Sequence, residues 1–223
     1  MSSTVQESAW QGDPLPRGRH KLGMEEVRAS QRARIARAII EVVAEHGYEA
    51  ATVTQVVTAA RVSRNAFYEF FTDKSDAFTT VTEEKGRELL DAMLAMAGED
   101  NWIDAIRRGT ALYLAWWQEH ATFGRAYFAG LAELGPRGLA QRERGYAPFV
   151  AMFSELGRRA RVEQPKLEPL SPLVPRALVF AITEIVAEEL RHGREDQLGE
   201  LAPDLFRLLV RLLGDDETAR AAG

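Results

Sequence analysis

Cysteine is absent from the 223 residues of this sequence, and long apolar runs are absent as well. Without cysteine there is no disulfide framework, thiolate metal site or cysteine nucleophile, which fits a reducing cytoplasm. The N-terminal residues lack the apolar core of a secretory signal. The most apolar stretch, Ala177 to Leu190, is 14 residues long and contains three glutamates, so it is a poor membrane span. We therefore expect a soluble, cytoplasmic protein with no membrane partner.

The sequence also lacks the patterns that carry catalysis or hold a metal. Its four histidines are scattered and show no paired ligand spacing. There is no G-x-S-x-G motif, no glycine-rich phosphate loop and no obvious pair of carboxylates on one helix face. We expect a protein that is not an enzyme and that uses no metal and no cofactor.

Charge is distributed unevenly along the chain. The net charge of -5 argues against a nucleic-acid partner at first sight. Between Leu15 and Ile40, however, seven basic residues outnumber two acidic ones, whereas from Ala77 onward 23 acidic residues outnumber 18 basic ones. A basic N-terminal segment in front of an acidic body is what a chain needs if only one end meets phosphates.

Residues 1–24 mix Ser, Gly, Pro and charge without any period, so we expect a mobile tail there. Its basic side chains either reach DNA or belong to a solvated leader without a role; they are Arg17, Arg19, His20 and Lys21. Order is expected to begin near Arg28. An apolar stripe through Ile35, Ile39 and Val43 then predicts an amphipathic helix that Gly47 ends.

Two short helices are predicted next. Thr52 and Gln55 have the spacing of a capping box in front of a buried stripe of valines. Ser63 is the N-cap of a third helix that runs to Phe70, with Val62 packing on Phe67. Two short helices joined by about three residues are typical of a helix-turn-helix.

Beyond Thr72 the chain reads as further helices separated by polar breaks. The expected spans are 76–97, 102–119, 122–134, 138–160, 172–192 and 203–214. The predicted fold class is all-α, with an N-terminal three-helix domain that contains the helix-turn-helix and a larger helical domain. The predicted segments are a tail at 1–24, the helix-turn-helix domain at 25–74, the larger domain at 75–214 and a second mobile tail at 215–223.

The third helix has the composition of a recognition helix. If its phenylalanines face inward, four side chains face outward: Arg64, Asn65, Ala66 and Tyr68. Arginine can bond a guanine edge in two places, asparagine can do so for adenine, alanine can touch a thymine methyl and tyrosine can reach a phosphate. The alternative is that these are ordinary surface residues of a small helix.

At this point the sequence resembles a family. The segment from Arg34 to Phe78 is similar to the N-terminal domain of the TetR-like transcriptional regulators. The resemblance rests on Gly47, Tyr48, Thr52, Val53, Val62, Ser63, Phe67, Tyr68, Phe71 and Lys74, which stand in the family's spacing. It covers about 45 residues. The rest of the chain resembles the family in length and helical character.

The resemblance implies which residues meet DNA. Thr52, Thr54, Tyr68 and Lys74 match positions that contact the phosphate backbone, and Arg64, Asn65 and Ala66 match positions that face bases. The full set expected at double-stranded DNA is Thr52, Thr54, Ser63, Arg64, Asn65, Ala66, Tyr68 and Lys74.

One residue departs from the family pattern. The family usually has glycine where this chain has Arg61. If the position needs a positive φ, arginine costs about 1 to 2 kcal/mol there. Either the turn is slightly reshaped, or Arg61 adds a phosphate contact.

The last two long helices, around Ala177–Ala187 and Leu205–Leu213, are apolar on most faces. Such helices must be covered on both sides, either by deep burial in a monomer or by a second subunit. The resemblance favours a homodimer, because TetR-like proteins use their last two long helices as the dimer interface. The predicted interface residues are Leu178, Ile182, Ile185, Phe206, Leu209 and Leu213.

The middle of the chain is rich in aromatic residues. The resemblance implies an effector cavity there, and the predicted lining residues are Trp116, Trp117, Tyr127 and Phe149. Plain core packing is the alternative for each of them.

Together these observations predict a DNA-binding transcriptional regulator, a repressor that a small hydrophobic ligand releases from its operator. Residues 75–214 then bind the effector and dimerise. The alternative is a helical small-molecule-binding or interaction protein that has lost DNA affinity.

Overall fold

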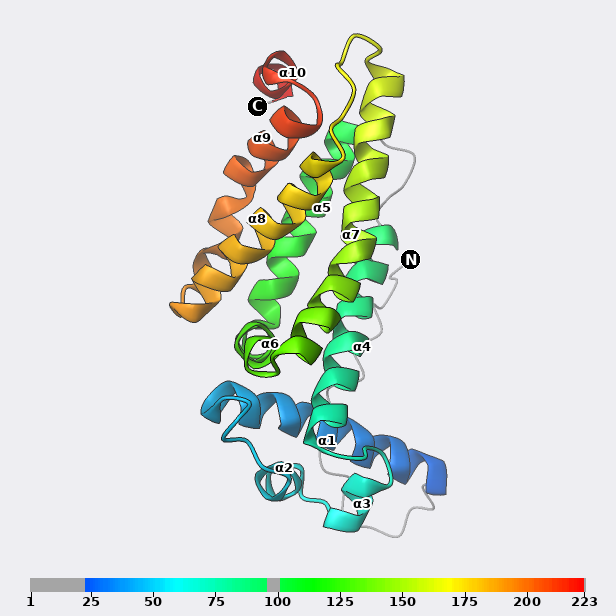
Figure 1. Cartoon of the computed structure of the whole chain (residues 1–223), viewed down its shortest axis with the longest axis vertical. Helices are drawn as coiled ribbons and strands as arrows, with labels where there is room; N and C mark the ends of the chain where they lie inside the picture. The colour runs from blue at the N-terminus through cyan, green and yellow to red at the C-terminus, as the bar shows by residue number, and fades with distance from the viewer. Residues whose placement is uncertain (1–22, 96–100, 223) are drawn as a thin grey trace, which may run out of the picture.

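The computed structural model describes residues 23–95 and 101–222. Within these ranges the chain forms helices and no strand, which confirms the predicted all-α class. Figure 1 shows three helices at one end of the molecule: α1 (Met24–His46), α2 (Val53–Ala60) and α3 (Arg64–Tyr68). The expected DNA contact of the basic tail falls on residues outside the described ranges.

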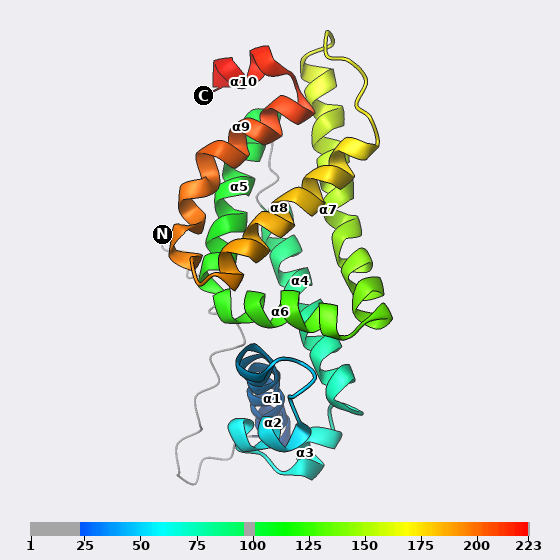
Figure 2. The same ribbon diagram turned by 60° about the vertical axis from the view of Figure 1, so that its left-hand side comes forward.

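The remaining helices form a larger body. They are α4 (Lys74–Ala95), α5 (Trp102–Glu119), α6 (Ala121–Glu133), α7 (Pro136–Glu163), α8 (Leu173–Arg191), the 3₁₀ helix η1 (Glu195–Leu201), α9 (Ala202–Leu213) and α10 (Asp216–Ala222). Figures 1 and 2 show α4 rising from the α1–α3 end into this body and α6 lying across the molecule next to α1. None of the helices in the described ranges has the length and apolarity of a membrane span.

The first helix starts earlier than the sequence pattern indicated. α1 begins at Met24 rather than near Arg28, and the Gly23 N–H donates to Glu26 Oε2 at 3.0 Å, which is the half of a capping box that a glycine N-cap can form. Its apolar stripe is buried as predicted. Gly47, with a φ of 81°, ends the helix.

The caps predicted for α2 and α3 are both present. Thr52 Oγ1 accepts from the Gln55 N–H at 3.2 Å, and Gln55 Oε1 accepts from the Thr52 N–H at 2.8 Å. Ser63 Oγ accepts from the Ala66 N–H at 3.0 Å. These bonds use backbone donors that a helix start otherwise leaves unpaired. α3 ends at Tyr68, two residues before the predicted end.

Arg61 joins the two helices in the left-handed conformation, with φ 52° and ψ 48°. The position therefore requires the positive φ for which glycine is usual. Arg34 Nη1 donates to the carbonyls of Ala60 and Arg61, each at 3.1 Å, and so caps the C-terminus of α2.

The C-terminal tail predicted at 215–223 is wrong for residues 216–222, which form α10. The Asp215 carboxylate accepts from the Thr218 N–H at 2.7 Å and starts the helix. Arg107 Nη2 donates to the Ala222 carbonyl at 2.7 Å at its other end. The Thr218 hydroxyl also donates to Gln164 Oε1 at 3.1 Å. These two contacts with residues distant in sequence stabilise a helix too short to form alone. The helix η1 was also not predicted.

Replacing Arg61 with glycine should stabilise the protein. The left-handed conformation costs a residue with a Cβ about 1 kcal/mol or more, and glycine avoids most of it. A gain of about 1 kcal/mol corresponds to a rise of about 2 to 4 °C in the unfolding midpoint of a chain of this size. Arg61→Ala is the matched control, because it removes the same side chain but keeps the Cβ. An equal rise in both variants would show that the arginine side chain, not the backbone conformation, is unfavourable.

Candidate functional site

The outer face of α3 carries polar groups that form no bond with the described part of the chain. Arg64, Asn65 and Tyr68 are exposed, and Tyr68 is 49% exposed despite its aromatic ring. Their side chains form no hydrogen bond or ion pair with any other residue that the structure describes. The Ser63 and Arg61 geometry at the start of α3 fixes the direction in which they point. This face is therefore free to bind a polar surface.

The other predicted contact residues lie around this face, with one exception. Thr52, Thr54 and Ser63 are exposed, although the hydroxyls of Thr52 and Ser63 already serve as caps. Ala66, in contrast, is only 7% exposed. The prediction that Ala66 faces outward is wrong, because α3 is one short turn that buries Ala66 together with Phe67.

Lys74 differs from the prediction in what its ammonium binds. It stands at the start of α4 as expected, but Nζ donates to the carbonyl of Tyr48 at 2.5 Å and to that of Glu49 at 3.3 Å. Nζ also lies 4.2 Å from the centroid of the Tyr48 ring. Partial burial lowers the pKa of Lys74, while the carboxylates of Glu133 and Glu49 act in the opposite direction. The side chain thus points back to the turn after α1 rather than out to a phosphate.

The arginines of α1 are also engaged within the chain. Arg28 pairs with Glu69 at 3.4 Å, and Arg32 pairs with Glu84 of α4. Arg34 caps α2 as described above. Much of the basic charge that the sequence concentrates in α1 therefore holds the helix-turn-helix against its neighbours.

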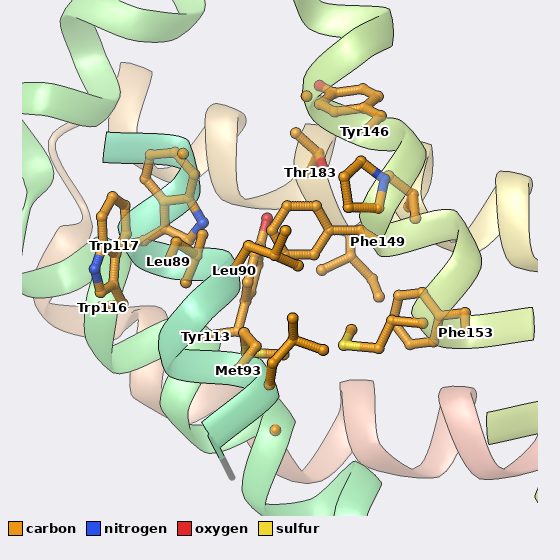
Figure 3. A pocket seen from close by; sticks show the side chains of 18 of the residues that line it. Leu89, Leu90, Met93, Tyr113, Trp116, Trp117, Tyr146, Phe149, Phe153 and Thr183 are labelled. Carbon is orange, nitrogen blue, oxygen red and sulfur yellow. The ribbon is translucent and has the colours of Figure 1, made fainter. Parts of the chain in front are cut away.

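A cavity of about 510 Å³ lies in the body between α4, α5, α7 and α8 (Figure 3). Its volume falls within the range of small-molecule sites. All four residues predicted to line a cavity do line it: Trp116, Trp117, Tyr127 and Phe149. The α4 side of the wall, which includes Leu89, Leu90 and Met93, was not predicted. No sequence signal separates it from ordinary core, because a cavity wall and a packed core use the same apolar stripe.

Polar groups interrupt the apolar wall on one side. The Thr183 hydroxyl and the phenols of Tyr113 and Tyr146 all line this side. Burial raises the pKa of Tyr113 to about 12 and also raises the pKa of Tyr127. These phenols are therefore neutral hydrogen-bonding groups at physiological pH.

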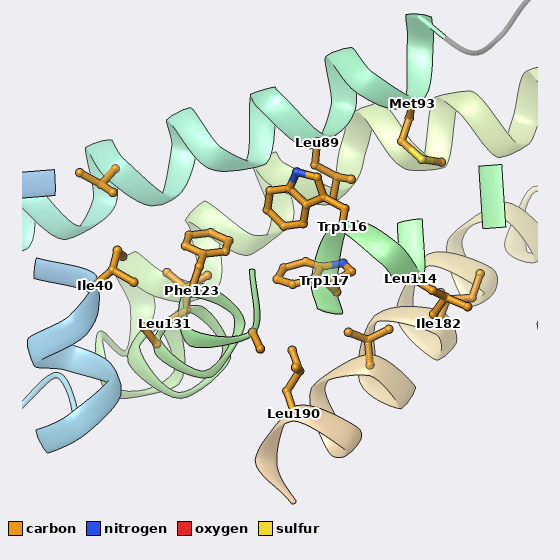
Figure 4. Close-up of a cluster of buried hydrophobic side chains, with 14 of the residues drawn as sticks. Ile40, Leu89, Met93, Leu114, Trp116, Trp117, Phe123, Leu131, Ile182 and Leu190 are labelled. Atoms are coloured by element: carbon orange, nitrogen blue, oxygen red, sulfur yellow. The ribbon is translucent and has the colours of Figure 1, made fainter. Parts of the chain in front are cut away.

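Aromatic rings connect the cavity to α6 (Figure 4). The ring of Trp117 stacks on that of Phe123 with centroids 5.9 Å apart, and the ring of Trp116 stacks on His120 at 4.3 Å. Phe123 belongs to α6, and His120 is the residue between α5 and α6. A molecule that displaces either tryptophan would therefore press on α6.

α6 in turn contacts the helix-turn-helix end of the molecule. Gly130 permits a close approach, since a Cβ there would lie 2.6 Å from Phe78 Cζ of α4 and 3.2 Å from Val43 Cγ1 of α1. At the end of α6, Glu133 Oε2 accepts from the Glu49 N–H at 2.8 Å. We name this contact region the α6 junction; it comprises Val43, Glu49, Phe78, Gly130 and Glu133.

The predicted dimer-interface residues are mostly buried within the chain itself. Leu178, Phe206 and Leu213 are at most 5% exposed, and Ile182 and Leu209 line the cavity. Ile185 is half-buried. The sequence pattern therefore chose the inner faces of α8 and α9. Their outer faces carry Phe180, Leu208 and Leu212, which are 39%, 36% and 41% exposed.

Comparison with known proteins finds a family match for the N-terminal segment and a shared fold for most of the chain. Residues 35–79 match the family model of bacterial regulatory proteins of the tetR family. No match is found among curated proteins. Among solved structures, the chain is similar to the fatty acid degradation regulator FadR from Bacillus halodurans, with a TM-score of 0.75 and 18% identity over 81% of this chain and 94% of that one.

Two further structures show the same fold. FadR from Bacillus subtilis in complex with stearoyl-CoA has a TM-score of 0.72 and 17% identity, over 79% of this chain and 96% of that one. The TetR family transcriptional regulator PfmR from Thermus thermophilus has a TM-score of 0.63 and 24% identity, over 81% of this chain and 95% of that one. These likenesses establish a shared all-helical fold.

Replacing Lys74 with methionine should loosen the turn between α1 and α2. The change removes two hydrogen bonds from a charged donor to backbone carbonyls, and we expect a loss of about 1 to 2 kcal/mol in the free energy of unfolding. Thermal unfolding would measure it, with Lys166→Met, at an exposed lysine of the α7–α8 loop, as the control. Identical midpoints for the Lys74 variant and the unmodified protein would mean that the ammonium does not stabilise this turn.

Proposed function

We propose that this chain binds specific DNA sequences and regulates transcription. The match of residues 35–79 to the tetR family model and the similarity of its fold to that of a TetR family transcriptional regulator support this. The observation that carries the proposal is the outer face of α3. Arg64, Asn65 and Tyr68 extend from a helix that two caps and a left-handed turn hold in place. Within the described residues, none of the three side chains forms a hydrogen bond or an ion pair.

The chemistry of this face fits the major groove. A short helix that enters the groove by its N-terminus brings its first residues against base edges. Arg64 and Asn65 are the first two residues of α3, and their side chains can form paired bonds to guanine and adenine respectively. We expect the exposed side chains of Tyr68 and Thr54 to contact phosphates. Lys74 and Arg34 do not contact DNA in this proposal. They stabilise the turns before and after α2 and so fix the orientation of α3.

Specific binding requires two such helices, and we propose a homodimer through the outer faces of α8 and α9. Phe180, Leu208 and Leu212 give these faces an apolar surface that a second copy would cover. In a two-fold dimer each α3 meets one half of a symmetric operator, so the spacing of the two helices controls affinity.

We further propose that a small hydrophobic ligand releases the repressor from its operator by entering the cavity. The path to DNA runs through Trp116 and Trp117 to α6 and then through the α6 junction to α1. The FadR structure in complex with stearoyl-CoA supports an effector with a long apolar chain. If α6 has one position with high DNA affinity and one with low DNA affinity, a ligand that binds only the second lowers DNA affinity by linkage.

Selection of bound duplexes from a random pool by the purified protein tests this proposal. The expected result is enrichment of a motif with two-fold symmetry, and the protein should cause a matching shift in fluorescence anisotropy of a labelled duplex. Absence of any enriched motif would overturn DNA binding and favour the alternative, a helical ligand-binding or interaction protein without DNA affinity.

Arg64→Ala should weaken binding to the selected duplex by about 1 to 3 kcal/mol per half-site and relax the preference at one base position in each half. Fluorescence anisotropy on a panel of single-base operator variants would measure both effects. The matched control is Arg137→Ala, at an exposed arginine at the start of α7. A uniform loss on every sequence would make Arg64 a phosphate contact and leave base reading to Asn65.

The double substitution of Leu208 and Leu212 with glutamate should yield a folded monomer. Both residues lie on the outer face of α9, so the charges disturb an interface and not the core. Sedimentation velocity and circular dichroism would measure assembly and fold separately. Leu209→Glu is the contrasting variant, since it buries a charge inside the chain and should unfold it. An unmodified protein that is already monomeric at micromolar concentration would overturn the proposed interface.

A further inference from the structure

The wall of the cavity contains a buried amide whose oxygen has no hydrogen-bond partner. Gln141 of α7 lines the cavity and is only 3% exposed. Its Nε2 donates to the carbonyl of Thr79 at 3.1 Å and to the hydroxyl of Thr82 at 2.5 Å, both on α4. Its Oε1 is buried and accepts no hydrogen bond from the described residues. A buried acceptor without a donor costs free energy, so a bound molecule that supplies the donor gains affinity here.

The neighbours of this amide determine which of its ends is the nitrogen. The carbonyl of Thr79 can only accept, so it must face the NH₂ group. The hydroxyl of Thr82 already donates to the carbonyl of Phe78 at 2.8 Å, so it too accepts from Gln141. An exchange of the two amide ends would place acceptor against acceptor. The group without a partner is therefore the oxygen, and only a donor can satisfy it.

Two glycines leave space beside the amide. Gly145 lies four residues after Gln141 on α7, and Gly86 lies four residues after Thr82 on α4; both line the cavity. A helical side chain covers the turn that precedes its own Cα, so side chains at positions 86 and 145 would cover the amide. A Cβ at Gly86 would meet no described atom within 4 Å, and one at Gly145 would meet the Tyr127 hydroxyl at 3.6 Å. The cavity therefore reaches the region of the amide.

Two further polar atoms of the wall are buried without a hydrogen bond to the described residues. They are Thr110 Oγ1 and Trp117 Nε1, both on α5. The indole N–H can only donate, whereas the hydroxyl can donate or accept. An occupant that satisfies the wall thus needs a donor for Gln141 and an acceptor for Trp117. A hydroxyl group provides both on one oxygen, whereas an ether, a ketone or a carboxylate provides acceptors alone.

Arginines in the lining make an anionic head the competing occupant. Arg87, Arg144 and Arg159 all line the cavity. Arg144 pairs with Glu83 at 3.1 Å and its side chain is 66% exposed, so its charge lies toward solvent. Arg87 Nε donates to the Glu83 carbonyl at 3.3 Å. A carboxylate bound by these residues would still leave Gln141 Oε1 without a donor, because an ionised carboxylate has no proton to give.

We propose that the cavity recognises a hydroxylated hydrocarbon, whose hydroxyl donates to Gln141 Oε1 while its hydrocarbon part lies along Leu89, Met93 and Phe153 (Figure 3). Side chains around the amide cover this oxygen, so the head group reaches it after a small movement of its neighbours. The ligand class deepens the effector part of the proposed function and rests on it for regulation, whereas binding itself is measured without DNA.

Three small amphiphiles test the inference: decan-1-ol, its isomer methyl nonyl ether, and decanoate. Isothermal titration calorimetry on the full chain measures the three dissociation constants. We expect the alcohol to bind about fivefold or more tightly than the ether, as one net hydrogen bond provides. The ether is the more hydrophobic isomer, so burial of apolar surface alone would favour it instead. Decanoate should bind more weakly than the alcohol.

Gln141→Met should abolish the preference for the alcohol over the ether. Methionine is similar in length and apolar, so the donor loses its acceptor while the cavity keeps most of its shape. Any general change in shape or stability affects both isomers, and the ratio of their dissociation constants in the same variant therefore isolates the hydrogen bond. Gln197→Met is the matched control, at an exposed glutamine of η1 outside the cavity lining, and it should leave the ratio unchanged.

Three results would each overturn the inference. They are equal affinities of the alcohol and the ether in the unmodified protein, a preference for the alcohol that persists in Gln141→Met, and tightest binding by decanoate with affinity lost in Arg144→Gln. The last result would place an anionic head among the arginines. Anisotropy measurements with the operator report DNA binding separately, so failure of the ligand class and failure of the proposed regulator function remain distinguishable.

Discussion

The close approach of α6 to α1 and α4 is the constraint on which the rest of the molecule depends. A side chain at position 130 would collide with Phe78 and Val43, so only glycine lets the three helices meet at this distance. Once they meet, Glu133 can reach the Glu49 N–H, and Lys74 can close over Tyr48 from the other side. The turn between α1 and α2 is therefore held by residues of two later helices. Close-packed elements of this kind move together rather than deform gradually.

The same packing connects the cavity to the helix-turn-helix. Its wall includes Trp116 and Trp117 of α5 and Phe123 and Tyr127 of α6, so a helix that lines the cavity also contacts α1. The rings form a continuous set of contacts, from Tyr113 through Trp117 to Phe123 and Tyr127. A cavity elsewhere in the body, for example between α9 and α10, would have no comparable connection to the helix-turn-helix.

Sequence reasoning succeeded where the determining contacts are local. The caps at Thr52 and Ser63 each join residues three positions apart, and both were predicted. The positive φ at Arg61 was left open, because it rested on the glycine that the family usually has there. It failed where a distant partner decides. Arg34 and Lys74 bond backbone carbonyls 25 to 27 residues away, so no periodicity reveals their direction. For α8 and α9, apolar on most faces, the pattern could not distinguish the side that packs on the chain's own core from the outer side. α10 was missed because distant residues stabilise it: Arg107 of α5 and Gln164 at the end of α7.

Arg34 has a further consequence for chimeric regulators, in which the recognition segment of one protein is transplanted into another. Arg34 lies on α1, and the two carbonyls that it bonds, those of Ala60 and Arg61, lie at the end of α2. In a chimera that carries a graft of residues 52–71, the host therefore supplies the donor and the graft supplies the acceptors. Because the acceptors are backbone atoms, the graft can differ in its side chains and still accept hydrogen bonds from Arg34, provided that its turn adopts the same left-handed geometry. The modular unit of this fold is therefore defined by a backbone shape at position 61 rather than by a sequence, and α1 is better left with the host than exchanged with the graft.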